Sequence, residues 1–159
     1  MESISPRVLL VVHGREPVGW ASEARRAVSM LNKPIVRVLA VLDFTRPPFT
    51  SLTPFARRAY SEAIAYWREQ QEVNVQGMID QIVPFLPEPI EIVRLRRNKE
   101  RVGDVIAEHV INWPADAVVV ATPALSVLSR LGFGFVSDDL LREMTCAVIV
   151  TRSATVAKE

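Results

Sequence analysis

Two stretches of the chain hold residues that could bind an anion. His13 and Gly14 directly follow an apolar run, Arg7–Val12. The second stretch follows the run Ala117–Ala121 and is a glycine-containing loop that leads into a short predicted helix over residues 137–145. Backbone N–H groups at the start of a helix point outward, and the helix dipole favours negative charge there. The chemistry to expect at these two loops is therefore the binding of a phosphate or another anion.

The polar side chains of these loops allow a binding role and a structural one. Arg130, with Ser126 and Ser129 in the same loop, could contact an anion through side chains. An ordinary solvated loop is the alternative, and it is the one we favour. His13 could contact a ligand, carry a proton or sense pH, or it could cap carbonyl groups at the sheet edge.

Residues for catalysis are poorly supported by their spacing. The chain has no phosphate-binding Walker loop and no G-x-S-x-G, and Cys146 has no histidine near it in the sequence. The Gly132-Phe133-Gly134 segment lacks the third glycine of a dinucleotide-binding loop and does not follow the first strand. His109 falls on the apolar face of a predicted helix, which favours a partly buried structural role over metal binding. We therefore predict no catalysis and no metal site, and we rank an enzyme on a flavodoxin-like or nucleotide hydrolase-like sheet last.

Apolar runs and helical spacing predict the elements that position these loops. The predicted strands are Arg7–Val12, Ile35–Leu42, Ile90–Leu95, Ala117–Ala121 and Ala147–Thr151. Helices are predicted from Trp20 until Pro34, from the N-cap Thr53 until near Pro84, over Val102–Trp113 and over 137–145. This alternation predicts an α/β fold with a parallel sheet and helices on both faces. In such sheets ligands bind beyond the carboxyl ends of the strands, where the strand order reverses, so the loops after Val12 and Ala121 are the candidates.

Length, composition and charge set the class of protein. The 159 residues are 49% hydrophobic and 23% charged with a net charge of +1, which indicates one globular domain over residues 1–152 and a short tail over 153–159. The near-neutral charge argues against a nucleic-acid or membrane partner. Cys146 is the single cysteine, which favours a reducing cytosol. A basic cluster, which we interpret as a solvated edge, comprises Arg94, Arg96, Arg97, Lys99 and Arg101.

The end of the chain resembles a known family. Val136-Ser137-Asp138, a predicted helix and then Cys146-Ala147-Val148-Ile149-Val150 are similar to the closing pattern V-S-[ED], helix, C-P-V-x-V of universal stress proteins, with Ala147 in place of the proline. The resemblance spans Ser5 to Arg152. It implies a Rossmann-like open sheet of five parallel strands in the order 3-2-1-4-5, like that of the adenine nucleotide alpha hydrolases, and a protein that forms dimers.

The ATP-binding motif of this family is degenerate in the chain. ATP-binding members carry G-x2-G-x9-G-[ST], and the matching positions are Ala121, Ala124, Gly134 and Phe135. The aspartate that reads adenine matches His13, and the residue that packs on the base matches Val41. The candidate site that the resemblance implies is completed by Gly14, Thr122, Arg130 and Val136. Alanine adds a Cβ where glycine lets the backbone approach phosphate, and phenylalanine removes a hydroxyl donor. We interpret the motif as vestigial and expect no strong ATP cofactor, although ATP or another adenine nucleotide stays open as a ligand.

The expected function follows from the resemblance. It implies a cytosolic stress-response or regulatory protein that forms a homodimer through its last strand (Ala147, Val148, Ile149, Val150, Thr151), because unpaired N–H and C=O groups at a sheet edge invite a second copy. The alternative is a nucleotide- or anion-binding sensor with a non-standard loop after the fourth strand. In that alternative Gly134, Val136 and the start of the next helix hold phosphate groups, with Arg130 assisting.

Overall fold

A computed structural model describes residues 4–14, 16–17, 19–44, 53–98, 100, 102–121, 144 and 146–151. The strands are β1 (Arg7–Val12), β2 (Ile35–Asp43), β3 (Ile90–Arg97), β4 (Ala117–Ala121) and β5 (Ala147–Thr151). The helices are α1 (Trp20–Ser29), α2 (Pro54–Ile82) and α3 (Val102–Asn112), and a short 3-10 turn, η1 (Val83–Phe85), follows α2. The predicted helix over 137–145 and the predicted tail over 153–159 lie outside the described residues.

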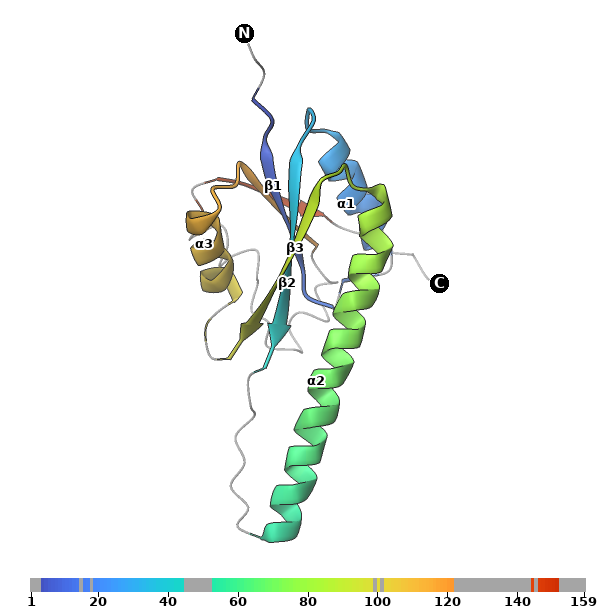
Figure 1. Ribbon diagram of the computed structural model, residues 1–159, viewed down its shortest axis with the longest axis vertical. Coiled ribbons are helices and arrows are strands. Elements are labelled where there is room, and N and C mark those ends of the chain that lie inside the picture. Colours follow the sequence, from blue (N-terminus) through green and yellow to red (C-terminus); the bar gives the residue numbers. More distant parts are fainter. Residues whose placement is uncertain are drawn as a thin grey trace, which may run out of the picture.

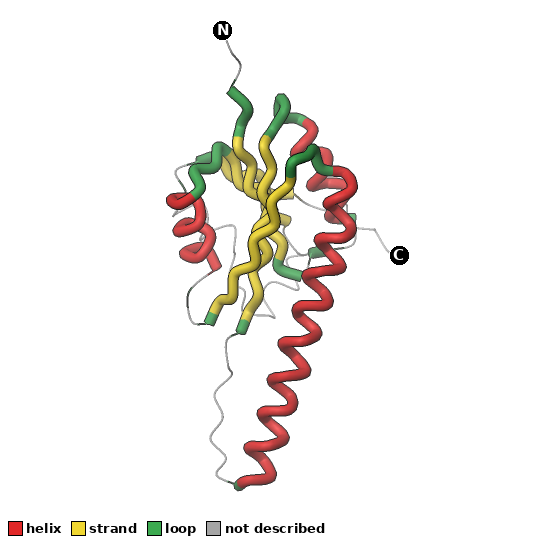
Figure 2. The backbone as a smooth tube through the Cα atoms, viewed as in Figure 1, coloured by secondary structure: helices red, strands yellow, loops and turns green. Residues whose placement is uncertain are grey.

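The five strands form one parallel sheet in the order β3-β2-β1-β4-β5, which confirms the predicted order. Helices α1 and α2 cover one face and α3 covers the other (Figure 1). Figure 2 shows the sheet as the central layer between these helices. Strand β1 lies in the middle, between β2 and β4, and this is where the strand order reverses.

Strand β1 is buried on both faces, which explains its continuous apolar run. Val8, Leu10 and Val12 pack toward α1 and α2, whereas Leu9 and Val11 pack toward α3. Successive side chains of a strand point to opposite faces. A parallel strand covered by helices on both sides therefore needs an apolar residue at every position.

Helix α2 is long, and its N-terminal half extends beyond the sheet (Figure 1). Thr53 caps it as predicted, because the Thr53 Oγ1 accepts the backbone N–H of Ala56 at 3.2 Å. The side that packs on the sheet buries Ile64, Gln71, Val75, Ile79 and Ile82. In the described part of the chain, no helix is both long and apolar enough to span a membrane.

Most predicted boundaries are confirmed, and the differences have local causes. Strand β2 continues to Asp43, one residue past the predicted run, and β3 continues to Arg97, two residues past the predicted run. An ion pair of 2.8 Å between Arg97 Nη2 and Asp43 Oδ2 joins these strand ends. Helix α1 ends at Ser29, well before the expected stop at Pro34, and the chain turns through Lys33, whose φ is 49°.

Candidate functional site

The carboxyl ends of the three central strands meet at one edge of the sheet. Val12 lies opposite Ala40 of β2, and Val11 lies opposite Val120 of β4. His13, Val41 and Ala121 are therefore brought to the same edge, as predicted. The other predicted site residues lie outside the described residues, and their roles stay predictions: Thr122, Ala124, Arg130, Gly134, Phe135 and Val136.

A buried carboxylate occupies the end of β1. The Glu16 carboxylate accepts the backbone N–H of His13 at 2.5 Å and that of Gly14 at 2.9 Å. Its Oε2 also lies 3.5 Å from Nδ1 of His13, and the Glu16 side chain is fully buried. Two successive backbone N–H groups at the end of a strand form an anion-binding arrangement. Here the chain's own glutamate fills it.

Gly14 is the residue that brings this loop against α2. Its φ is 88°, a conformation that residues with a Cβ rarely adopt. A Cβ at this position would also lie 3.0 Å from Cγ2 of Val75. Both the backbone conformation and the close contact with α2 therefore require glycine here.

A small polar hollow of about 70 Å³ lies between the end of β1 and α2. Its walls are His13, Gly14, Trp67, Gln70, Gln71 and Asn74. Gln71 Oε1 accepts the backbone N–H of Asp43 at 2.7 Å, which ties this wall to the end of β2. The volume is that of about two water molecules, so the hollow can hold solvent or a small polar group rather than a nucleotide base.

The two predicted apolar contacts at this edge belong to the core. Val41 is 3% exposed and packs in the cluster between the sheet and α3. Ala121 is 4% exposed and packs in the cluster on the α1 and α2 side. The part of Val41 in binding a base, which the resemblance implies, stays a prediction.

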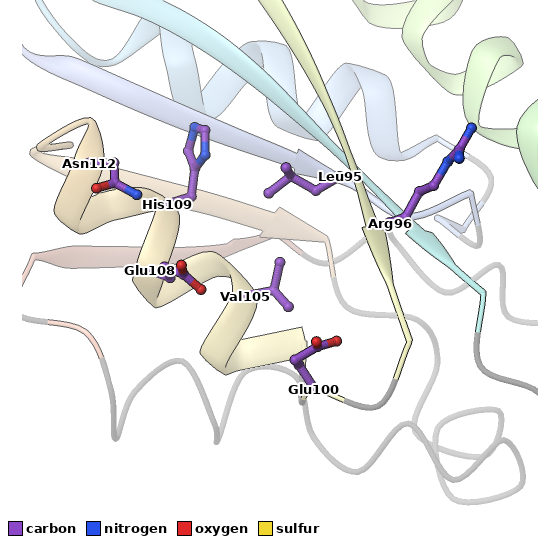
Figure 3. Close-up of a pocket in the computed structure, with 7 residues that line it drawn as sticks. All are labelled: Leu95, Arg96, Glu100, Val105, Glu108, His109 and Asn112. Atoms are coloured by element: carbon purple, nitrogen blue, oxygen red, sulfur yellow. The ribbon is translucent and has the colours of Figure 1, made fainter.

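A second, larger hollow of about 240 Å³ lies between β3 and α3 (Figure 3). Its lining residues are Leu95, Arg96, Glu100, Val105, Glu108, His109 and Asn112. In Figure 3 the Leu95 side chain extends from β3 toward α3, whereas that of Arg96 extends to the opposite side of the strand. The Arg96 guanidinium lies 5.0 Å from the ring centre of Phe44, so it contacts an aromatic ring instead of the hollow.

His109, in the wall of this hollow, has the partly buried structural role that its sequence position predicts. Its Nε2 lies 3.3 Å from Nη1 of Arg37, and Arg37 pairs with Glu91 at 2.7 Å. The Arg37 guanidinium also lies 4.6 Å from the ring centre of Trp113. Burial first, and then the charge of Arg37, lower the pKa of His109, and Glu91 opposes them. The neutral imidazole is thereby favoured as an acceptor for Arg37.

The described residues contain no group of three or more histidine, cysteine or acidic side chains that could hold a metal ion. The basic cluster is partly used within the fold: Arg97 pairs with Asp43, and Arg94 donates to Gln76 Oε1. Lys99 and Arg101 lie outside the described residues.

Two polar residues that shape this site, Gln71 and Glu16, were not identified from the sequence. Gln71 carried a signal, because a polar residue falls in the buried stripe between Ile64 and Val75 and must find polar partners. Glu16 carried a weaker signal, namely an acid four residues after the end of the first strand, in a loop that contains a glycine. Its burial depends on the path of the loop, which the sequence pattern does not specify.

Most of the chain matches a known protein family. The model of the "Universal stress protein family" matches residues 22–152. The chain belongs to the universal stress protein family. No curated protein sequence matches it as a relative.

Solved structures with low sequence identity share the fold of this family member. The universal stress protein UspA from Lactobacillus plantarum is 15% identical, with a TM-score of 0.63, over 95% of this chain and all of the other. A universal stress protein in complex with cAMP is 15% identical, with a TM-score of 0.55, over 96% and 100%. A family protein from Arabidopsis thaliana with AMP bound is 13% identical, with a TM-score of 0.54, over 94% and 93%.

Proposed function

We propose that the protein is a cytosolic stress-response regulator that works by binding partners, catalyses no reaction and does not bind ATP strongly. The observation that carries this proposal is the buried Glu16 carboxylate on the His13 and Gly14 N–H groups. A phosphate that approaches the end of β1 meets a negative charge and N–H donors that are already used. A hydrogen bond to a charged group contributes roughly 1.5–3 kcal/mol, so each donor that is lost weakens binding about tenfold or more.

The degenerate loop after β4 is also expected to weaken ATP binding. Ala121 and Ala124 replace two glycines of the ATP motif, and Phe135 replaces a residue with a hydroxyl group. Several weakened contacts together move a micromolar ligand out of the useful range. The cytosolic location is proposed on the single cysteine of the chain, Cys146.

The test of this proposal is a calorimetric titration of the native protein with ATP, combined with mass spectrometry of small molecules released by denaturation. We expect no bound nucleotide and no heat of binding at millimolar ATP. Released AMP, ATP or a related nucleotide, or a micromolar titration, would contradict the proposal and favour the second candidate.

The second candidate is a nucleotide-binding sensor, and the cAMP and AMP complexes of similar structures favour it. In this proposal Gly134, Val136 and the start of the following helix hold phosphate groups, with Arg130 assisting and His13 and Val41 near the base. Arg130→Ala is then expected to weaken nucleotide binding by about tenfold. Unchanged affinity would remove Arg130 from the site.

We further propose that the regulator is a homodimer paired through β5. The two edges of the sheet differ in charge: β3 carries Glu91, Arg94 and Arg96, whereas β5 has no charged residue. Charged side chains on an edge strand discourage pairing with another strand. Uncharged β5 is therefore the edge that favours a second copy across a two-fold axis.

Light scattering with matched variants tests the β5 dimer. Val150 of β5 is 38% exposed and Ile92 of β3 is 39% exposed, so they form a pair with equal exposure on opposite edges. Val150→Lys is expected to halve the mass of the assembly, and Ile92→Lys is expected to leave it unchanged. A wild-type monomer at micromolar concentration, or equal effects of both variants, would overturn this interface.

A further inference from the structure

Helix α2 carries a second apolar stripe on the side away from the sheet. Its members recur at intervals of three or four residues, with Gln70 filling the one longer gap: Phe55, Ala59, Ala63, Tyr66, Val73 and Gly77. Phe55 is 84% exposed, Tyr66 is 65% exposed and Val73 is 58% exposed. At 3.6 residues per turn, Tyr66 points roughly 160° away from buried Ile64. No described segment of the chain covers this stripe.

An open hollow of about 610 Å³ lies at the C-terminal half of the stripe. Its lining residues are Glu69, Glu72, Val73, Gln76, Gly77, Asp80 and Arg94. A Cβ built on Gly77 would meet no atom within 4 Å. The helix surface is therefore recessed here, beside an exposed valine, and a bulky apolar side chain can enter.

The stripe is complementary to itself when it is reversed about Tyr66. Phe55 lies eleven residues before Tyr66, and the recess at Gly77 lies eleven residues after it. Ala59 and Val73 lie seven residues before and after Tyr66. At a rise of 1.5 Å per residue, the bulky and recessed ends are thus each about 16 Å from the centre.

We propose that a second copy of this chain packs along α2, with the two helices antiparallel and the two-fold axis at Tyr66. Phe55 of each copy then fills the recess at Gly77 of the other, and Ala59 lies against Val73. The two Tyr66 rings meet at the axis. Because the stripe faces away from the sheet that α2 covers (Figure 1), the two sheets lie on the outer sides of the proposed helix pair.

Charged residues along α2 pair in part in the antiparallel arrangement. Along one flank of the stripe a base comes first and acids follow: Arg58, Glu62, Glu69 and Glu72. In the proposed register Arg58 lies within reach of Glu72 of the second copy. Glu62 lies opposite Gln70, one residue away from Glu69 of the second copy, so this acidic pair opposes the contact, whereas the two Arg58–Glu72 pairs favour it. A parallel pair would instead set Phe55 beside Phe55 and leave the recess unfilled.

This interface is separate from β5 and does not rest on the proposed function. It uses the same patch on both copies, which closes the assembly at two chains. If β5 also pairs, the two contacts together join more than two chains.

The first test is the mass in solution, measured in a background that removes the β5 contact. Val150→Lys protein is expected to remain a dimer, and adding Tyr66→Glu is expected to make it a monomer. Ser61→Glu is the control, because Ser61 is exposed on the same helix but about 140° away from Tyr66. A monomeric Val150→Lys protein, or a Tyr66→Glu protein with unchanged mass and unchanged helix content, overturns the α2 interface. The former result leaves the β5 dimer intact.

Disulfide trapping tests the direction of the helices. In a Cys146→Ser background, Phe55→Cys and Gly77→Cys proteins are oxidised separately and as a mixture. Since a disulfide needs close Cβ atoms, the antiparallel register predicts a covalent dimer in the mixture and little in either protein alone. Ser61→Cys is the control and is expected to form no covalent dimer under oxidation. A covalent dimer of Phe55→Cys protein alone would contradict the register.

Discussion

The side chain of Gln71, on α2, binds both backbone polar groups of Asp43 at the end of β2. Its Oε1 accepts the Asp43 N–H at 2.7 Å, and its Nε2 donates to the Asp43 carbonyl oxygen. Strand β1 pairs with β2 only as far as Ala40. Beyond that point the amide of Gln71 takes the place of the neighbouring strand and fixes α2 to the edge of the sheet that holds His13.

Gln71→Leu is expected to lower the free energy of unfolding by about 1–3 kcal/mol, because it leaves two buried backbone groups without their partner. Asn74→Leu is the matched control, since Asn74 is exposed on the same helix and lines the same hollow. Urea unfolding with equal m-values measures the difference. Equal stabilities of the two variants would show that Gln71 does not hold the strand end.

Glu16→Ala is expected to destabilise the protein by a similar amount, about 1–3 kcal/mol, because the N–H groups of His13 and Gly14 lose a charged acceptor. Glu23→Ala is the control and is expected to have a small effect, because Glu23 is a partly exposed acid in the first turn of α1. Thermal unfolding of both variants gives the comparison.

Inorganic phosphate provides a second measurement, which compares the Glu16→Ala protein with the wild type. If Glu16 acts as an internal anion, phosphate is expected to raise the melting temperature of the Glu16→Ala protein more than that of the wild type, because it can accept the freed N–H groups. An equal phosphate effect on both proteins would mean that these N–H groups do not form an anion site.

The sheet could be predicted from the sequence because its strands are simple. Val8–Val12 and Ala117–Ala121 are apolar throughout, since both faces of each strand are covered there. The ends of β2 and β3 were predicted too short, because Asp43 and Arg97 are charged residues that remain in the strands by pairing with each other. Local apolar patterns carry no information about such a cross-strand pair.

The location of the candidate site could be predicted from the sequence, but the residue that fills it could not. Strand order brings His13, Val41 and Ala121 to one edge, and this follows from the alternation of strands and helices. The burial of Glu16 depends on the positive φ of Gly14 and on the contact of that glycine with Val75. Both are tertiary features, so the sequence showed an acid in a loop without showing that it fills the site.

Cys146 is expected to react slowly with thiol reagents in the native protein. Burial raises the pKa of its thiol, the charge of Asp116 adds to the rise, and a backbone hydrogen bond opposes it. Because the thiolate is the reactive form, a raised pKa lowers the reactive fraction near neutral pH. Ellman's reagent added at pH 8 to native and urea-unfolded protein measures the two rates. A native rate equal to or above the unfolded rate would contradict the prediction.

The pKa of His109 is expected to lie below that of a solvent-exposed histidine. Proton NMR can follow its titration, because the chain has only two histidines. Burial and the Arg37 charge lower the pKa of His109, whereas Glu91 raises it. Arg37→Gln is therefore expected to raise this pKa, and Glu91→Gln is expected to lower it further. The second shift should be small, because the Glu91 side chain is 62% exposed and its charge is screened.

The same pKa shift makes stability depend on pH. The unfolded chain takes up a proton at His109 near its ordinary pKa of about 6.5, before the folded protein does. The stabilising contribution is complete above that pH and is lost as the pH falls from about 6.5 toward the folded pKa. His109→Gln should flatten this part of the urea-midpoint profile. If the variant keeps the wild-type slope between about pH 7 and pH 5, where histidine titrates, the pH dependence of stability arises elsewhere in the chain.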